Sequence, residues 1–219
     1  MRLLFLSLCL AAGGVFAESE WQPLFDGKSL QGWRNYQSEN VRKQWIVTGG
    51  ELKLTGKGGG DLITERSFQN FELTVDWKVS EGGNSGIFFL ADESADRIYF
   101  NAPEVQILDD ARHADGKISS HRSGSLYDLV ASPDASQKAA GEWNTTTIRI
   151  HKSQLTVHHN ELLVTDIKIG SNTWDELVAN SKFKNWPGFG KNSRGHIGLQ
   201  DHGDQVSFRN IKIRELNND

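Results

Sequence analysis

One segment of this chain, Phe71–Val79, alternates apolar and polar side chains without interruption. Successive side chains of a β-strand point to opposite faces, so the apolar residues of this segment share one face and Glu72, Thr74, Asp76 and Lys78 share the other. Such a strand must bury one face of its sheet against a second layer. This pattern is typical of antiparallel sheets that have one covered face and one polar face.

Other short apolar segments, separated by glycine turns, predict strands along most of the chain. The clearest hairpin joins 44–47 to 51–54 through Thr48-Gly49-Gly50. A single helix is predicted, where Thr173-Trp174-Asp175-Glu176 fits a capping box. There is no internal repeat, linker or low-complexity tract. The sequence therefore predicts an all-β jelly-roll sandwich of two antiparallel sheets with one short helix.

The first 17 residues have the pattern of an export signal. A short basic start is followed by an apolar stretch over 3–12 and by small residues that end at Ala17. We expect cleavage after Ala17, which leaves one domain over 18–219 in the periplasm or outside the cell. The only cysteine, Cys9, is an alternative site of lipid attachment. Bulky Leu8 before it favours plain secretion.

The rest of the sequence excludes several classes of protein. Removal of Arg2 from 24 bases leaves 23 against 28 acids, a net charge of about −5 with histidine neutral. A mildly acidic chain without a basic block argues against nucleic acid as a partner. No later apolar segment approaches the length of a membrane span. A mature chain without cysteine has no disulfide and no thiol chemistry.

The segment Pro103–Asp110 is the first candidate for function. It reads as a strand in which Glu104 and Gln106 share one face, with Asp109 and Asp110 where the strand ends. A carboxylate beside an amide can bind a sugar or move a proton. The alternative is the solvated outer face of an antiparallel sheet.

A series of short motifs runs in order through nearly the whole mature chain. They include Leu24-Phe25-Asp26-Gly27, Gly58-Gly59-Gly60-Asp61-Leu62, Gly83-Asn84-Ser85-Gly86-Ile87, Glu104-x-Gln106-x-x-Asp109-Asp110, Gly124-x-x-Tyr127-Asp128, and Gly195-His196-Ile197-Gly198-Leu199-Gln200-Asp201-His202-Gly203. Together they resemble the 3-keto-disaccharide hydrolase domain family. The resemblance implies a concanavalin A-like jelly roll that acts on glycosides whose sugar carries a ketone at C3. It also implies a functional link to a sugar 3-oxidoreductase, which makes the ketone.

The implied chemistry needs no nucleophilic carboxylate. A C3 ketone acidifies the proton at C2, and the group leaving C1 sits beta to the carbonyl. A base, an acid and a group that holds the enolate oxygen then suffice for elimination, after which water adds. The alternative is a lectin-like carbohydrate-binding module without chemistry, because one fold can serve both functions.

Three residues are predicted to be catalytic under this resemblance. Glu104 would transfer the proton, unless it is a structural acid paired with a base. His202, at the end of a strand, would act as acid or base, unless it is only a surface histidine. Lys78 would stabilise the enolate oxygen, unless it pairs with an acid across the sheet.

The predicted substrate-binding residues lie mostly in turns and at strand ends. Asn84 and Ser85 can donate to sugar hydroxyls or only cap their turn. Asp61 follows three glycines that let a ligand approach the backbone, and Trp186 can stack on a sugar ring. The remaining members of this set are Gln106, Asp109, Tyr127, Gln200 and Asp201. His202 with Asp201, Glu104 or Asp109 could also hold a divalent metal ion, although the ligand spacing is not that of a known motif.

Two further expectations concern residues outside the site. Trp33, Trp45, Trp143 and Trp174 are predicted to belong to the core. His158-His159 is predicted to be an exposed pair beside a turn.

Overall fold

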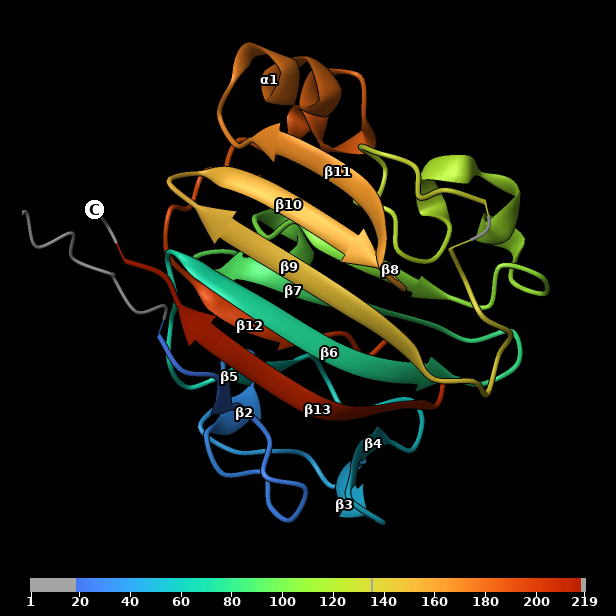
Figure 1. The fold of residues 1–219 in the computed structure, drawn as a ribbon. Helices are drawn as coiled ribbons and strands as arrows, with labels where there is room; N and C mark the ends of the chain where they lie inside the picture. Colours follow the sequence, from blue (N-terminus) through green and yellow to red (C-terminus); the bar gives the residue numbers. More distant parts are fainter. Residues whose placement is uncertain (1–18, 135, 218–219) are drawn as a thin grey trace, which may run out of the picture.

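Two antiparallel sheets stack face to face in the computed structural model (Figure 1), which describes residues 19–134 and 136–217. The predicted signal segment, residues 1–17, lies outside the described residues. The predicted all-β sandwich is confirmed, with most strands close to their expected positions.

The larger sheet has eight strands in the order β11-β10-β9-β6-β13-β4-β3, with β1 paired to β13. The alternation predicted for β6 is confirmed, because every second residue of this strand is buried. β6 lies between β9 and β13, so its apolar face covers the centre of the sandwich. The strands are β1 (Gln22–Pro23), β3 (Trp45–Thr48), β4 (Glu51–Leu54), β6 (Phe71–Val79), β9 (Asn144–His151), β10 (Gln154–His159), β11 (Leu162–Lys168) and β13 (Val206–Glu215).

The smaller sheet runs in the order β2-β5-β12-β7-β8 and lies behind the larger one in Figure 1. Its strands are β2 (Trp33–Asn35), β5 (Leu62–Thr64), β7 (Asn84–Ala91), β8 (Glu104–Leu108) and β12 (His196–Leu199). All residues of β7 and β8 are buried. The outer face of β8 is therefore covered, and the solvated-face interpretation of Glu104 and Gln106 is wrong.

The short helical segments cover the ends and edges of the sheets. The one α-helix of the described residues, α1 (Asn172–Ala179), begins two residues earlier than the capping-box pattern predicts. Ser171 is its N-cap, and the Ser171 hydroxyl accepts a hydrogen bond from the Trp174 amide (3.3 Å). The 3₁₀ helices are η1 (Ile98–Phe100), η2 (Ala114–Lys117), η3 (Ser119–His121) and η4 (Lys182–Asn185).

Three of the four predicted core tryptophans are buried, namely Trp33, Trp45 and Trp174. Trp143 is only half-buried and lies between two cations on the outer face of the larger sheet. The Lys78 ammonium is 4.4 Å from its ring centroid and the Arg209 guanidinium is 3.9 Å away. A tryptophan in this position stabilises the polar face rather than the core.

His159 was predicted to be exposed, and this prediction is wrong. Its side chain is 0% exposed and stacks on Trp77, with ring centroids 5.6 Å apart. The alternation along β10 explains the difference, because it directs His159 between the sheets while its neighbour His158 is only half-buried. Burial lowers the pKa of His159 to about 4.

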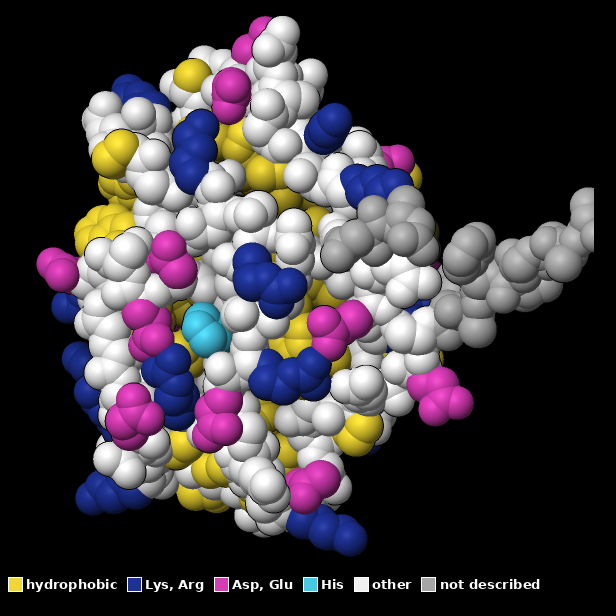
Figure 2. All heavy atoms as spheres, turned by 90° about the vertical axis from the view of Figure 1, so that its left-hand side faces the viewer, with side chains coloured by type: hydrophobic (Ala, Val, Ile, Leu, Met, Phe, Trp, Pro, Cys, Tyr) yellow, Lys and Arg dark blue, Asp and Glu magenta, His cyan; other side chains and the backbone are white. Residues whose placement is uncertain are grey.

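Basic and acidic side chains are interspersed on the side of the molecule in Figure 2, so neither sign of charge forms a continuous field there. Within residues 19–134 and 136–217, no helix has the length and apolar character needed to cross a bilayer.

Candidate functional site

A cavity of about 330 Å³ lies over the covered outer face of the smaller sheet. Strands β7 and β8 form its base, η1 and η4 form two walls, and the segment after β12 closes one end. Seven predicted site residues meet here, although they come from distant parts of the chain. The lining residues are Asn84, Tyr99, Ala102, Glu104, Gln106, Tyr127, Lys182, Phe183, Trp186, Gln200 and His202.

Glu104 occupies space that its neighbour on β7 leaves free. Gly86 lies opposite Gln106 on the neighbouring strand, and a Cβ atom on Gly86 would come 1.9 Å from Glu104 Oε1. The Glu104 side chain is 7% exposed. No described residue donates a hydrogen bond to its carboxyl group, so this group is free to act on a ligand.

The surroundings of Glu104 favour its protonated form. Burial raises its pKa to about 8, the nearby Lys182 ammonium opposes this shift, and the negative charge of Asp61 adds to it. A carboxyl group with a pKa near neutrality in a cavity can both take up and return a proton under physiological conditions.

Lys182 is the cation that faces Glu104, and sequence reasoning missed it. Its ammonium lies 4.0 Å from the ring centroid of Tyr127. Its backbone amide donates to Asp128 Oδ2 (2.8 Å), and Asp128 Oδ1 lies 2.9 Å from His121 Nε2. Burial lowers the pKa of Lys182, and Glu104 opposes that shift. The sequence around Lys182 contains no recognisable functional motif, so only the folded structure shows that this lysine lines the cavity.

Two buried amide oxygens in this cavity lack a hydrogen-bond partner among the described residues. They are Asn84 Oδ1 and Gln200 Oε1. Buried polar atoms are rarely left unpaired in folded proteins, so each of these is expected to accept a hydrogen bond from a ligand. Sugar hydroxyls are suitable donors, and both residues belong to the predicted substrate-binding set.

An aromatic wall faces these polar groups. Trp186 packs edge-on against Phe100, with centroids 4.9 Å apart, and lies 5.2 Å from Phe183. Phe183 stacks on Phe189 at 3.9 Å, which fixes the wall. An apolar wall opposite hydrogen-bonding groups is the arrangement that binds the two kinds of surface of a sugar ring.

Ser85 and Asp109 were predicted to bind substrate, but the structure does not bring them into the cavity. The Ser85 hydroxyl donates to the Gln200 carbonyl (2.9 Å). Asp109 accepts from the Gly82 amide (2.7 Å) and the Ala111 amide (3.2 Å). Both residues therefore hold the turns that surround the site.

Lys78 lies in the other sheet, remote from the cavity. It belongs to the polar face of β6, where its ammonium is 2.8 Å from Glu51 Oε1. The alternation of β6 directs Lys78 away from the interior of the sandwich. The structure therefore agrees with the alternative role of Lys78, an ion pair with an acid on another strand of the same sheet.

A second cavity of about 410 Å³ adjoins the first, and His202 lines both. It contains the predicted residues Asp61 and Asp201. Asp201 Oδ2 accepts hydrogen bonds from the amides of Gly58 (3.1 Å) and Gly60 (2.7 Å). Asp61 Oδ1 accepts one from the Asp201 amide (3.0 Å). Burial raises the pKa of Asp61 to about 6.

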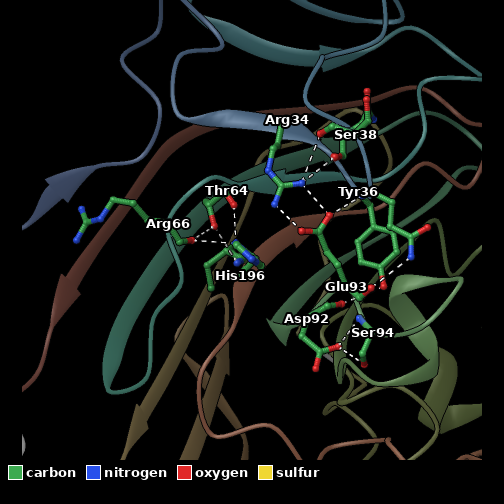
Figure 3. Close-up of polar contacts among 12 residues, drawn as sticks. Arg34, Tyr36, Ser38, Thr64, Arg66, Asp92, Glu93, Ser94 and His196 are labelled. Carbon is green, nitrogen blue, oxygen red and sulfur yellow. Dashed lines mark hydrogen bonds and ion pairs between the residues drawn. The ribbon is translucent and has the colours of Figure 1, made fainter.

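The loop that forms one wall of the second cavity is fixed by a polar network (Figure 3). Arg34 on β2 donates to both carboxylate oxygens of Glu93 (2.8 and 2.5 Å). The Tyr36 hydroxyl donates to the Ala95 carbonyl (2.6 Å). These contacts hold Glu93 and Ala95 against β2 and the residue that follows it, and Arg97 lies two residues further along the same loop.

The residues that were predicted as ligands of a divalent metal ion do not cluster in the structure. Within the part of the chain that the structure describes, no group of three or more His, Cys, Asp or Glu side chains is placed to hold a metal. Asp109 is directed to its own turn, and Asp201 is occupied by backbone amides. We therefore derive no chemical step through a metal.

The fold and the cavity define a carbohydrate-active protein of the jelly-roll class. Residues 20–214 match the 3-keto-alpha-glucoside-1,2-lyase-like domain. A 3-keto-disaccharide hydrolase from Bacteroides thetaiotaomicron is 40% identical over 224 residues, which cover 88% of this chain and 77% of that protein. The chain therefore belongs to the 3-keto-alpha-glucoside-1,2-lyase-like family, and the predicted resemblance is confirmed.

Solved structures show the same architecture. A candidate glycosyl hydrolase from Parabacteroides distasonis is 26% identical with a TM-score of 0.83, and the match covers 90% of this chain and 94% of that one. A Bacillus subtilis protein of unknown function with a galectin-like fold has a TM-score of 0.60 at 15% identity, covering 90% and 94% of the two chains. The second likeness concerns the fold alone, and it agrees with the predicted concanavalin A-like sandwich.

Proposed function

We propose that this protein cleaves the glycosidic bond of 3-keto-glycosides by elimination followed by hydration. The observation that carries the proposal is the buried Glu104 carboxyl group, which has a pKa near neutrality and no hydrogen-bond donor among the described residues. It faces a cavity with free amide acceptors and an aromatic wall. The name of the Bacteroides thetaiotaomicron relative supports the same class of substrate.

Glu104 is the group that removes the C2 proton. The electron pair moves towards the C3 carbonyl, whose oxygen becomes an enolate. The Lys182 ammonium is the cation of this cavity and stabilises that negative charge. The carboxyl proton of Glu104 exchanges with solvent while the leaving group departs, and Glu104 then gives a proton to C2 when water adds at C1.

Departure of the group at C1 requires an acid, because a sugar alkoxide is a poor leaving group. His202, which lines both cavities, and Asp61, which lines the second, are the candidates for this role. Asn84 and Gln200 accept hydrogen bonds from sugar hydroxyls, and Trp186 contacts the apolar face of the ring.

Isotope exchange tests the proposal. Wild-type protein in heavy water should exchange the C2 hydrogen of a 3-keto-glucoside, with a rate that rises with pH up to about 8 because Glu104 must be ionised. Glu104→Gln should reduce exchange and cleavage by roughly 100-fold or more while binding persists. Cleavage in which C2 keeps its original hydrogen would reject the elimination route.

The competing function is a lectin-like module that holds sugars without reaction. It predicts equal binding of a glucoside and its 3-keto analogue with no product from either. A binding module has no requirement for the raised pKa of Glu104, so this observation favours the enzyme. Cleavage of the unoxidised glucoside at an equal rate would reject the requirement for the ketone.

The substrate class also implies a partner reaction. A 3-keto-glycoside arises by oxidation of the C3 hydroxyl group, so we propose that a sugar 3-oxidoreductase supplies the substrate. Supplying the unoxidised glycoside together with such an enzyme and its electron acceptor should restore cleavage. Failure of cleavage despite measured ketone formation would reject the link.

A further inference from the structure

We propose that the second cavity is the subsite for the leaving group, a second hydroxylated sugar, and that Asp61 is the acid that protonates the departing glycosidic oxygen. The inference rests on the proposed function, because it assigns the second half of the same substrate. It names a subsite, a class of leaving group and a catalytic residue.

The position of the second cavity carries the first part of the proposal. The two cavities share His202, so a ligand can extend from Glu104 past this residue into the second cavity. A sugar bound over Glu104 places the group attached at C1 outside the first cavity. The adjoining space of about 410 Å³ is a suitable size for one more sugar ring.

The lining of the second cavity indicates the chemistry of its ligand. Arg42, Lys57 and Arg97 line it, and no acidic group of the described residues lies within ion-pair distance of them. Their N–H groups are therefore available to hydroxyl oxygens. Besides His202, Tyr36 is the one aromatic residue in the lining, and its hydroxyl is hydrogen-bonded to the Asp92 and Ala95 carbonyls. Such a polar lining suits a sugar better than a flat apolar group.

Asp61 is oriented by a chain of hydrogen bonds. The amides of Gly58, Gly60 and Gly203 (2.9 Å) hold the Asp201 carboxylate, and the Asp201 amide holds Asp61 Oδ1. Asp61 Oδ2 is left to carry a proton towards the cavity. Burial raises the pKa of Asp61 to about 6, so a larger share of this group carries a proton near neutral pH than for an ordinary aspartate.

His202 is the competing acid, and the structure favours Asp61. The imidazole of His202 is exposed, and no described residue forms a hydrogen bond with it to set its orientation. An acid that must meet one departing oxygen benefits from a fixed position. His202 lies where the two sugars meet and contacts the linkage as a binding group.

The reaction balances with the two carboxyl groups. Glu104 takes the C2 proton, the C2–H electron pair forms the C1–C2 double bond, and the C1–O pair leaves with the oxygen that takes the Asp61 proton. Asp61, now a carboxylate, takes a proton from the water that adds to C1. Glu104 gives a proton to C2. One water is consumed, and both groups recover their starting forms.

A pair of substrates with different leaving groups tests the role of Asp61. Asp61→Asn keeps the size of the side chain and its bond to Asp201 but removes the proton. Cleavage of a 3-keto-disaccharide should fall by roughly 100-fold or more, because an alkoxide must be protonated as it leaves. Cleavage of the matching 4-nitrophenyl 3-keto-glucoside should fall less than about fivefold, because nitrophenolate leaves without an acid.

The same variant separates the failure of this inference from the failure of the proposed function. C2 exchange should persist in Asp61→Asn, which also shows that the protein is folded. Exchange in wild type together with equal losses on both substrates in Asp61→Asn would overturn only the role of Asp61. If His202→Gln showed the leaving-group dependence instead, that role would belong to His202. Absence of exchange in wild type would overturn the proposed function itself. Asp175→Asn on α1, an exposed aspartate outside both cavities, is the matched control.

The subsite is tested through binding. Arg97→Met should raise KM for the 3-keto-disaccharide by roughly tenfold and leave KM for the nitrophenyl substrate within about twofold, since charge-assisted hydrogen bonds contribute on this scale. Equal KM changes for the two substrates would overturn the placement of the leaving sugar in the second cavity.

Discussion

Gly86 leaves the space that the Glu104 carboxyl group fills, because a Cβ atom at Gly86 would lie 1.9 Å from Glu104 Oε1. Gly86 lies on β7 opposite Gln106, and Glu104 lies two residues before Gln106 on the neighbouring strand β8. Gly86 is thus a positioning residue for Glu104 rather than a residue required for an unusual backbone angle.

Gly86→Ala should displace the Glu104 side chain and slow C2 exchange by roughly 100-fold, because a small misplacement of a catalytic group is costly. Overpacking should lower the free energy of unfolding by about 1–3 kcal/mol. Exchange kinetics and urea unfolding measure the two effects. Gly188→Ala is the control, since its new Cβ would meet only an ordinary contact at 3.7 Å. Full activity of Gly86→Ala would contradict the assigned position of Glu104.

Glu104 should also make the stability of the protein depend on pH. Its folded pKa of about 8 lies above its unfolded value near 4.5, so its favourable contribution is complete below pH 4.5 and is lost as pH rises through 8. At about 1.36 kcal/mol per pKa unit, the full loss relative to Glu104→Gln is roughly 5 kcal/mol. Urea unfolding of both proteins at pH 5, 6.5 and 8 measures it. Parallel pH profiles would contradict the buried environment of Glu104.

Much of the fold could be predicted because its signals are local. The alternation of Phe71–Val79 follows from burial of one face, and glycine turns separate the strands. The expectation of an exposed histidine pair failed for His159, because the alternation along β10 places this polar residue in the core. The predicted start of α1 was two residues too late, because Ser171 rather than Thr173 is the N-cap.

The site could be predicted only in part, since it is assembled from distant segments. Glu104 and Gln106 belong to one strand, so their shared face was visible in the pattern. Lys78 and Lys182 show the limit of that approach. Which lysine meets Glu104 depends on which sheet contains each strand and on how η4 folds over the cavity.

Export is a separate prediction about the N-terminus. The basic, apolar and small-residue pattern of 1–17 predicts cleavage after Ala17. The intact mass of the protein recovered from the periplasm or medium should correspond to a chain that starts at Glu18. A retained N-terminus would contradict export with cleavage, and a diacylglycerol adduct on Cys9 would show lipidation instead.

His159 should destabilise the protein in mild acid. Its folded pKa of about 4 lies below the unfolded value near 6.5, so its contribution is present above pH 6.5 and is lost as pH falls through 4. The expected loss is about 3 kcal/mol. His159→Phe keeps a ring against Trp77 and removes the titration, so its stability should fall less between pH 6.5 and 4. His158→Gln is the control and should follow wild type. Equal acid sensitivity of all three proteins would show that His159 does not carry this effect.

The two lysines give the sharpest test of the site. Lys182→Met should slow C2 exchange by roughly 100-fold, because it removes the one cation that lines the cavity with Glu104. It should also move the midpoint of the exchange–pH profile upwards, since the Lys182 charge lowers the pKa of Glu104. Lys182→Arg keeps the charge and should retain more exchange than the methionine variant.

Lys78→Met is the matched control, since this lysine pairs with Glu51 on the other sheet. It should leave exchange within about twofold of wild type and lower stability by less than about 1 kcal/mol, as expected for a partly exposed ion pair. Exchange measured for the three variants over pH 6–9 distinguishes the two positions. A loss in Lys78→Met as large as that in Lys182→Met would mean that the cavity over β8 is not where the C2 proton is removed.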